Sequence, residues 1–174
     1  LSNWLTAPDF SSIFVLNGYA GTGKTTLIAA LVAVLDEMSI PAVLLAPTGR
    51  AAKVLSRYSG KQANTIHKRI YREKTNADYE SKFSLDINKE RGAVFIVDEA
   101  SMLSDHSSDG QIFGSGSLLE DLIKYVRSGK ECRLILVGDN AQLPPVGADY
   151  SPALDESVMQ SYGDVEYASM DDVV

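Results

Sequence analysis

The stretch GYAGTGKT, residues 18–25, decides the fold of this chain of 174 residues. It matches the pattern GxxxxGK followed by Ser or Thr at every specified position. The apolar run Ile13–Leu16 leads into it and the helix-period segment Thr25–Met38 follows it, which is the order of strand, loop and helix that a phosphate-binding loop requires. A dinucleotide fingerprint needs G-x-G-x-x-G, whereas the glycines here run G-x-x-G-x-G before a lysine. The loop therefore predicts a polyphosphate site and argues against a dinucleotide one.

Outward from this loop, apolar runs alternate with segments of helical period. Further strands are predicted at Ala42–Leu45, Ala93–Val97 and Arg133–Val137, and further helices at Arg50–Tyr58, Thr65–Arg72 and Leu118–Val126. Continuous apolar runs are typical of strands that are buried on both faces of a parallel sheet. The pattern predicts an α/β fold of three layers, with a mainly parallel central sheet flanked by helices. The polar segments Glu73–Arg91 and Asp105–Gly116 are predicted to be loops or small excursions on the surface.

The composition fits one compact domain, with 45% hydrophobic and 22% charged residues. The longest apolar stretch, Leu27–Leu35, is far shorter than the roughly 20 residues of a membrane-spanning helix, so we expect no membrane association. The one cysteine, Cys132, cannot form an internal disulfide, and with only two histidines beside it a structural zinc site lacks ligands. We expect a cytoplasmic protein in a reducing compartment.

The net charge of -7 argues against a protein that coats nucleic acid through its overall charge. Basic residues are nevertheless concentrated between Arg50 and Lys74, where Glu73 alone opposes them. From Asp149 onward the chain has no lysine or arginine. Such runs are usually solvated faces, but the basic one could also contact phosphate.

The residue types of the loop indicate how a nucleotide would be held. Glycines let successive backbone N–H groups and the helix N-terminus face a polyphosphate. Lys24 would reach the β and γ phosphates of ATP, and the Thr25 hydroxyl would bind Mg²⁺. The residues expected to bind the nucleotide are Gly18, Gly21, Thr22, Gly23, Lys24, Thr25, Thr26 and Asp98.

Two more predicted strands end in polar residues at the edge where open α/β sheets bind ligands. Asp98 would hold Mg²⁺ through its water shell, and Glu99 would orient and deprotonate the attacking water. In the segment 138–147, GDNAQLPPVG, the Asp139 carboxylate and the Gln142 amide could hydrogen-bond a γ-phosphate or its water. Local sequence alone leaves simpler interpretations open, namely a helix cap or turn for the acidic pair and an Asx turn stopped by prolines for the second segment.

Two further segments could grip a nucleic-acid backbone. In residues 46–52, APTGRAA, Thr48 and the N-terminus of the next helix could bind a phosphate, although Thr48 could equally be an ordinary helix cap. In residues 64–68, NTIHK, Thr65 and Lys68 could contact phosphate and His67 could stack on a base or ribose. A single histidine on a helix is more often simply packed.

Taken together, these motifs resemble, in order and spacing, the first five motor motifs of superfamily 1 DNA helicases, and most closely those of the RecD-like and Dda-like branch. The resemblance implies one RecA-like motor domain over residues 1–174, which binds ATP on one side and single-stranded DNA along the other with 5′ to 3′ polarity. It implies catalytic roles for Lys24, Glu99 and Gln142, with Gln142 coupling the phosphate state to the grip on DNA. The residues expected to contact DNA are Pro47, Thr48, Arg50, Thr65, His67 and Lys68.

The departures from the family pattern concern the two ends and one insertion. Such helicases carry an upstream glutamine that reads adenine, and a second RecA-like domain whose arginines complete the ATP site. Residues 167–174, YASMDDVV, look like the lead-in to the next motif, so we expect a fragment that binds nucleotide with little turnover. Residues 73–92 stand where the family carries its strand-separating hairpin.

We expect this chain to be the ATP-binding motor domain of an ATP-dependent DNA helicase in recombination, repair or replication, with a nuclease or replication protein as a possible partner. One alternative is another phosphate-loop NTPase, such as a small-molecule kinase or a nucleotide-gated regulator. Against it, no lid-like arginine cluster follows the acidic pair. The other alternative is an inactive helicase-like scaffold of a nuclease complex, which would have no physical need for Lys24, Thr25, Asp98 and Glu99 together.

Overall fold

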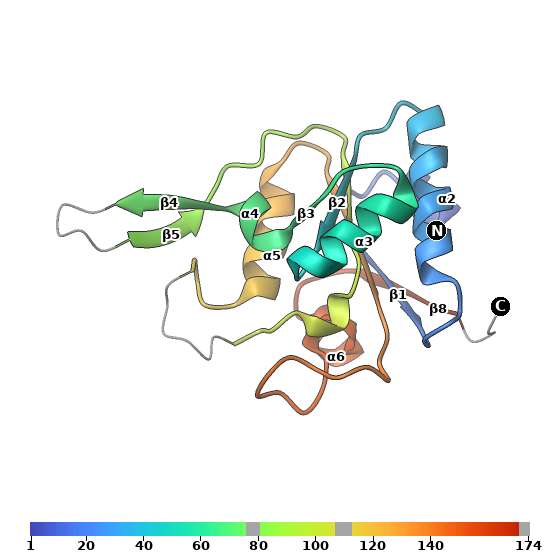
Figure 1. The fold of residues 1–174 in the computed structure, drawn as a ribbon. Coiled ribbons are helices and arrows are strands. Elements are labelled where there is room, and N and C mark those ends of the chain that lie inside the picture. The colour runs from blue at the N-terminus through green and yellow to red at the C-terminus, as the bar shows by residue number, and fades with distance from the viewer. Residues whose placement is uncertain (76–80, 107–112, 171–174) are drawn as a thin grey trace.

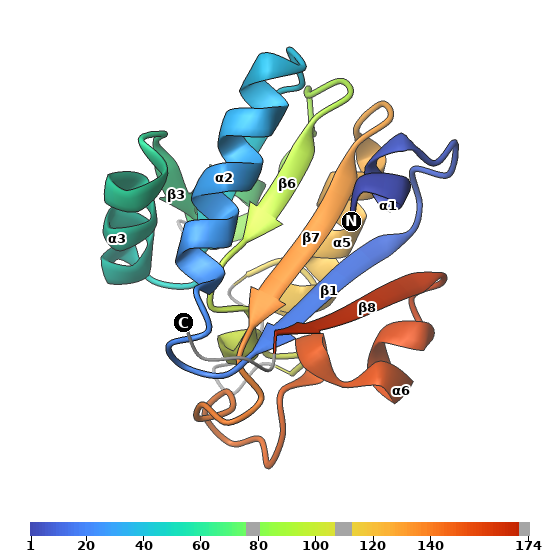
Figure 2. The same cartoon turned by 90° about the vertical axis from the view of Figure 1, so that its right-hand side faces the viewer.

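The computed structural model describes residues 1–75, 81–106 and 113–170, and a six-stranded sheet forms its centre (Figure 1). All pairings in this sheet are parallel, in the order β3-β2-β6-β7-β1-β8. The strands are β1 Ile13–Gly18, β2 Ala42–Ala46, β3 Ala63–Thr65, β6 Val94–Val97, β7 Arg133–Gly138 and β8 Val165–Met170. Because the strands are parallel, their carboxyl ends meet at one edge, where the loop after β1 turns into α2 (Figure 2).

Helices cover both faces of the sheet, which confirms the predicted three-layer α/β fold (Figure 2). One face is covered by α1 Ser2–Thr6, α2 Lys24–Glu37 and α3 Gly49–Ser59. The other is covered by α4 Ile66–Ile70, α5 Leu118–Ser128 and α6 Glu156–Gln160, with the short 3-10 helices η1 Ala100–Met102 and η2 Pro152–Leu154.

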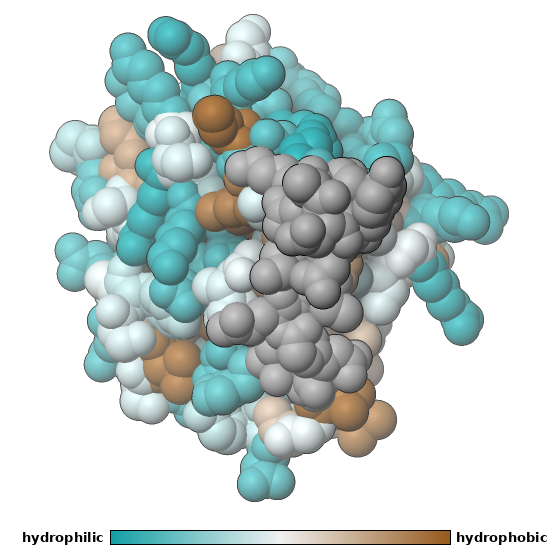
Figure 3. All heavy atoms as spheres, turned by 90° about the vertical axis from the view of Figure 1, so that its left-hand side faces the viewer, coloured by the Kyte–Doolittle hydropathy of each residue, from teal (hydrophilic) through white to brown (hydrophobic). Residues whose placement is uncertain are grey.

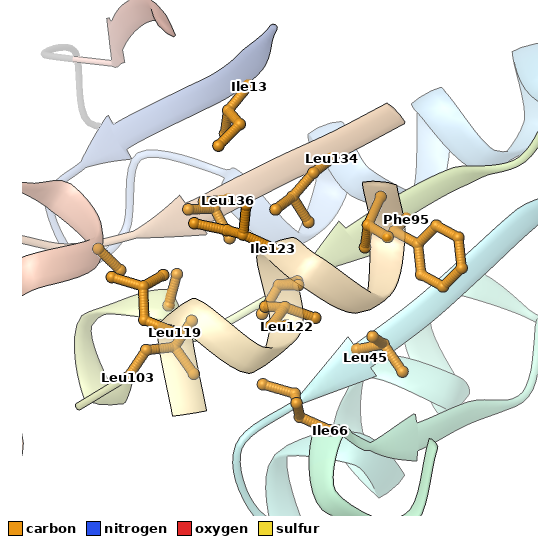
Figure 4. Close-up of a cluster of buried hydrophobic side chains, with 14 of the residues drawn as sticks. Ile13, Leu45, Ile66, Phe95, Leu103, Leu119, Leu122, Ile123, Leu134 and Leu136 are labelled. Atoms are coloured by element: carbon orange, nitrogen blue, oxygen red, sulfur yellow. The ribbon is translucent and has the colours of Figure 1, made fainter. Parts of the chain in front are cut away.

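Alternating side chains of the strands build two separate hydrophobic cores. In β7, Leu134 and Leu136 point toward α5, whereas Ile135 and Val137 belong to the cluster under α2. Figure 4 shows the cluster on the α5 side of the sheet. Phe95 of β6 belongs to this cluster and is fully buried. A sheet that is apolar on both faces explains why the strands read as continuous hydrophobic runs.

The four predicted strands are confirmed, but two strands of the six-stranded sheet, β3 and β8, were missed. β3 has only three residues, and β8 has only exposed and half-buried residues, so neither shows a continuous apolar run. The short helices α1 and α6 were also not predicted.

The prediction of a helix over Thr65–Arg72 was too long. Thr65 caps α4, which ends at Ile70, and the chain then enters β4, Tyr71–Thr75. β4 pairs in antiparallel fashion with β5, Ser81–Leu85, within the segment Glu73–Arg91 that was predicted to be a loop or small excursion and a possible hairpin insertion. The pair is anchored by aromatic packing, because Phe83 stacks on Phe113 with ring centroids 4.6 Å apart. Of the predicted loop Asp105–Gly116, residues 107–112 lie outside the described part of the chain.

No helix among the described residues is both long and apolar enough to cross a membrane. Seen from the side of β4 and β5, the surface around the grey atoms is mainly hydrophilic, with scattered hydrophobic spots (Figure 3). Exposed apolar residues that are scattered singly are normal on a folded domain.

Candidate functional site

The phosphate-binding loop between β1 and α2 has the backbone that its glycines permit. Gly21 and Gly23 both have φ of 83°, a left-handed conformation that residues with a side chain rarely adopt. A Cβ atom on Gly18 would lie 2.8 Å from Thr22 Oγ1, which is too close, so the loop can close tightly only with glycine there. Thr22 is buried, and its hydroxyl donates to the Tyr19 carbonyl at 2.8 Å. Its role here is to hold the loop.

Lys24, the first residue of α2, folds back over this loop. Its Nζ donates to the carbonyl oxygens of Gly18 at 2.6 Å and Tyr19 at 2.9 Å. The same Nζ lies 3.8 Å from Asp139 Oδ2 at the end of β7. The ammonium group is therefore fixed at the carboxyl edge of the sheet, in the position from which a phosphate-loop lysine reaches its ligand.

A cavity of about 740 Å³ opens beside the loop. Its lining contains seven of the eight residues predicted to bind the nucleotide, namely Gly21, Thr22, Gly23, Lys24, Thr25, Thr26 and, directly after β6, Asp98. Glu99 and Gln142 complete its polar wall, and the remaining lining residues are Ala20, Leu27, Ala30 and Met170. Gly18, the eighth, lies beneath the loop and is buried. The motifs that are far apart in the sequence thus converge on one hollow.

The acidic pair follows β6 directly, at the wall of the cavity. Asp98 Oδ1 accepts a hydrogen bond from the Glu99 N–H at 3.0 Å. Burial raises the pKa of Asp98 above its usual value, while this hydrogen bond and the charge of Lys24 act in the opposite direction. Burial also raises the pKa of Glu99, with a smaller contribution from the charge of Asp98. A nearby cation would stabilise the charged form of both carboxylates.

The oxygen ligands at this cavity suit Mg²⁺ better than a metal ion whose ligands must all come from the protein. The Thr25 hydroxyl and the Asp98 carboxylate line the same cavity, and both are hard oxygen ligands. The described part of the chain holds no cluster of three or more His, Cys, Asp or Glu side chains arranged for a metal ion. Mg²⁺ usually keeps several waters and shares its coordination with substrate phosphates, so one or two protein ligands suffice.

The segment after β7 forms the predicted Asx turn and also reaches the cavity. Asp139 Oδ1 accepts from the Ala141 N–H at 2.8 Å, and Asn17 Oδ1 of β1 accepts from the Asn140 N–H at 3.0 Å. This turn brings Gln142 to the cavity wall. The Asx turn is therefore compatible with a functional role of Gln142, because the turn positions its side-chain amide at the cavity.

Asp139 is the residue whose place the sequence described least well. It was considered as a partner of phosphate, but in the structure it is 1% exposed and faces Lys24. The sequence shows only that the aspartate directly follows a buried strand, whereas the pairing of this strand with β1 is seen in the structure.

Two of the residues predicted to contact DNA are helix caps. Thr48 Oγ1 accepts from the Ala51 N–H at the start of α3, and Thr65 Oγ1 accepts from the Lys68 N–H at the start of α4. Both lie at the carboxyl ends of neighbouring strands, since Ala46 of β2 pairs with Thr65 of β3. Pro47 stands between β2 and Thr48. The structure thus brings the two segments together at the edge that also carries the phosphate loop.

His67 lies half-buried in an aromatic cluster. Its ring centroid is 5.1 Å from that of Phe113 and 5.7 Å from that of Tyr71. Burial lowers the pKa of His67, which keeps the ring neutral at pH 7. The geometry favours the packed interpretation of this histidine over stacking on a base.

The basic stretch is partly neutralised by acidic neighbours. Lys61 pairs with Asp36 at 2.7 Å and Arg72 with Asp86 at 2.9 Å, and Arg69 pairs with Glu90. The side chains of Arg50, Lys53 and Lys68 are exposed. Basic charge available for a ligand is therefore concentrated on α3 and α4.

Replacing Lys24 by alanine is expected to lower the affinity of the chain for a non-hydrolysable ATP analogue by about 100-fold. The change removes the ammonium group that two loop carbonyls hold beside the cavity, and hydrogen bonds to charged groups contribute about 1.5–3 kcal/mol. Isothermal titration calorimetry measures the effect. Lys53→Ala removes the same charge from the exposed face of α3 and is expected to leave the affinity within twofold. Equal losses in both variants would contradict the site.

Comparisons with known proteins point the same way as the geometry. The chain matches the model of the family described as AAA domain over residues 6–173. It is 38% identical over 138 residues to the ATP-dependent DNA helicase dda of Enterobacteria phage T4, covering 75% of this chain and 28% of that protein. It is 31% identical over 144 residues to the ATP-dependent RecD2 DNA helicase of Deinococcus radiodurans, covering 78% of this chain and 16% of that protein. The chain thus spans less than a third of the length of these relatives.

Among solved structures, the Pif1 helicase from Candida albicans has the same fold, with a TM-score of 0.52 and 20% sequence identity. The match covers 94% of this chain and 36% of that one. With the family match and the shared fold in agreement, the chain belongs to the AAA domain family, and its motifs resemble those of the first motor domain of RecD-like and Dda-like superfamily 1 helicases.

Proposed function

We propose that this RecA-like domain binds and hydrolyses ATP as the first motor of an ATP-dependent DNA helicase. The observation that carries the proposal is the convergence of Lys24, Asp98, Glu99 and Gln142, from three separate segments, on one cavity at the carboxyl edge of the sheet. Relatives named as ATP-dependent DNA helicases support the same activity. The inactive scaffold is disfavoured, because it would not need this complete set.

Each residue has a distinct task in hydrolysis. Lys24 binds the β and γ phosphates, and the backbone N–H groups of the loop donate hydrogen bonds that stabilise the negative charge of these phosphates. Glu99 orients the attacking water and takes its proton. Gln142 contacts the γ phosphate or its water, and its turn is where a change of phosphate state would reach the DNA. Thr25 and Asp98 would hold Mg²⁺, which when bound neutralises charge between the β and γ phosphates.

Single-stranded DNA would lie along the ends of β2 and β3, next to the nucleotide. Pro47, Thr48 and Thr65 bring backbone and hydroxyl groups to this edge, and Arg50 and Lys68 supply charge. His67 would support this surface by packing. We propose 5′ to 3′ translocation driven by a second RecA-like domain, in recombination, repair or replication in the cytoplasm. A nuclease or replication protein is the proposed partner, and one relative is named as a subunit of the RecBCD enzyme.

The decisive experiment measures ATP hydrolysis by the full-length protein that carries this chain, with and without single-stranded DNA. Strong stimulation by DNA that disappears in Lys24→Ala is the expected result. A rate of ATP hydrolysis that does not change when DNA is added would indicate an ATPase of another kind and would refute the proposal of a DNA motor.

The DNA surface has its own test, in which Arg50 and Lys68 are both changed to alanine. We expect the affinity for single-stranded DNA to fall about tenfold at low salt, and the slope of log K against log salt to become shallower by about 1.4, because two phosphate contacts are lost. Fluorescence anisotropy of a labelled oligonucleotide measures both. Arg91→Ala with Lys130→Ala is the control, since it removes the same two charge types before β6 and β7, at the opposite edge of the sheet. Equal losses in both double variants would indicate unspecific attraction.

A further inference from the structure

Asp139 is a buried carboxylate that is only half satisfied. One oxygen, Oδ1, accepts the Ala141 N–H at 2.8 Å. The other, Oδ2, has no hydrogen-bond partner among the described residues, although the side chain is only 1% exposed. Its nearest opposite charge is the Lys24 ammonium, 3.8 Å away. An unpaired buried carboxylate oxygen is costly, so this position calls for an explanation.

The number of N–H donors on Lys24 explains why Asp139 Oδ2 has no hydrogen bond. An ammonium group has three N–H donors, and the carbonyls of Gly18 and Tyr19 take two of them. The third N–H of Lys24 is left for two competing acceptors, Asp139 Oδ2 and an oxygen of a bound phosphate. The distance of 3.8 Å is close enough for strong attraction in a buried site and too long for a hydrogen bond, so a small movement decides which acceptor is served.

We propose that Asp139 is a positioning residue that competes with the nucleotide phosphate for Lys24 and thereby weakens the hold on bound nucleotide. The competition favours release of ADP, whose charge is lower than that of ATP and which attracts the ammonium less. This inference rests on the proposed nucleotide site and goes beyond it by assigning a task to a residue outside the set that touches phosphate.

The same residue is connected to the turn that carries Gln142. The Asp139 carbonyl oxygen accepts the Gln142 N–H at 3.1 Å, while its side chain accepts the Ala141 N–H. A shift of Lys24 between Asp139 and a phosphate therefore acts on a residue whose backbone and side chain both shape this turn. Asp139 links occupancy of the loop to the position of Gln142.

The test is Asp139→Asn in the chain of 174 residues, with a fluorescent ADP as probe. Asparagine keeps the Oδ1 acceptor for the Ala141 N–H, but the group facing Lys24 becomes an uncharged amide. We expect the probe to bind about tenfold more tightly and to dissociate about tenfold more slowly in a stopped-flow chase. The control is Asp149→Asn, which makes the same change at an exposed position of the following loop and should stay within twofold.

A second pair of variants shows whether Asp139 acts through Lys24. In a Lys24→Gln background, Asp139→Asn is expected to change ADP affinity by less than twofold, because the contested donor is absent. A tenfold gain that persists there would mean that the carboxylate simply repels phosphate, which would overturn the proposal. Unchanged or weaker binding by Asp139→Asn alone, with a wild-type unfolding midpoint, would also overturn it.

The remaining outcomes are separable. Should Asp139→Asn fail to fold, Asp139→Ser makes the same test, because a hydroxyl can still accept from the turn and carries no charge. Failure of the wild-type chain to bind ADP at all would refute the nucleotide site itself. If ADP binding is lost in Lys24→Ala but unchanged in Asp139→Asn, the proposed function stands and this inference alone is refuted.

Discussion

Replacing Glu99 by glutamine is expected to slow ATP hydrolysis by about 10²- to 10⁴-fold, the usual contribution of a positioned general base. The amide has the shape of the carboxylate but cannot accept the proton of the attacking water. Affinity for nucleotide should be retained or tightened, because one negative charge leaves a cavity that receives a polyphosphate. Steady-state hydrolysis by the full-length protein with single-stranded DNA measures the rate, and calorimetry on the present chain measures the affinity.

The control for this substitution is Glu37→Gln, the same change at an exposed position at the end of α2. It should leave both quantities within twofold. A Glu99→Gln variant that hydrolyses ATP at more than a tenth of the normal rate would exclude Glu99 as the base. A variant that also loses nucleotide affinity would instead assign Glu99 to binding.

Replacing Phe95 by alanine is expected to lower the free energy of unfolding by about 3–5 kcal/mol. Phe95 is fully buried in β6, between β2 and β7, and its ring meets that of Tyr125 edge to face at 6.0 Å. The truncation leaves a cavity between the sheet and α5, which packed neighbours fill only in part. Urea unfolding measures the loss, and the midpoint should fall by more than about 1 M.

Tyr58→Ala provides the comparison, since this aromatic ring on α3 is 66% exposed. It is expected to stay within about 0.5 kcal/mol of the wild type. A small effect at Phe95, equal to that at Tyr58, would mean that the face of β6 toward α5 is not packed as described. Because single domains are stable by only about 5–15 kcal/mol, the Phe95 variant would lose a large share of the stability of the domain.

The centre of the fold could be predicted because its sequence signals are local. β1, the phosphate loop and the start of α2 follow one another without interruption, and the apolar runs of β6 and β7 leave little choice of structure. Lys24, Asp98 and Glu99 could be singled out for the same reason, and in the structure they line one cavity. Each directly follows or opens a strongly patterned element.

What could not be predicted depends on contacts between distant segments. β8 has an alternating pattern with polar residues and becomes a strand only because β1 offers it a free edge. A hairpin insertion over residues 73–92 was predicted, but the packing of β5 depends on the contact between Phe83 and Phe113, which lie thirty positions apart. The proximity of Asp139 to Lys24 likewise follows from the pairing of β1 with β7, which the local sequence of neither strand specifies.

The strand order also sets when the domain can mature during its own synthesis. β1 precedes both of its neighbours in the sheet, β7 and β8, by more than a hundred residues, so it leaves the ribosome well before they do. At about 5–20 residues per second, roughly ten seconds pass before β7 exists. Until then the phosphate loop follows an unpaired apolar strand, and such a strand favours aggregation of newly made chains. The nucleotide site would therefore be completed only after β7 has been synthesised and has paired with β1.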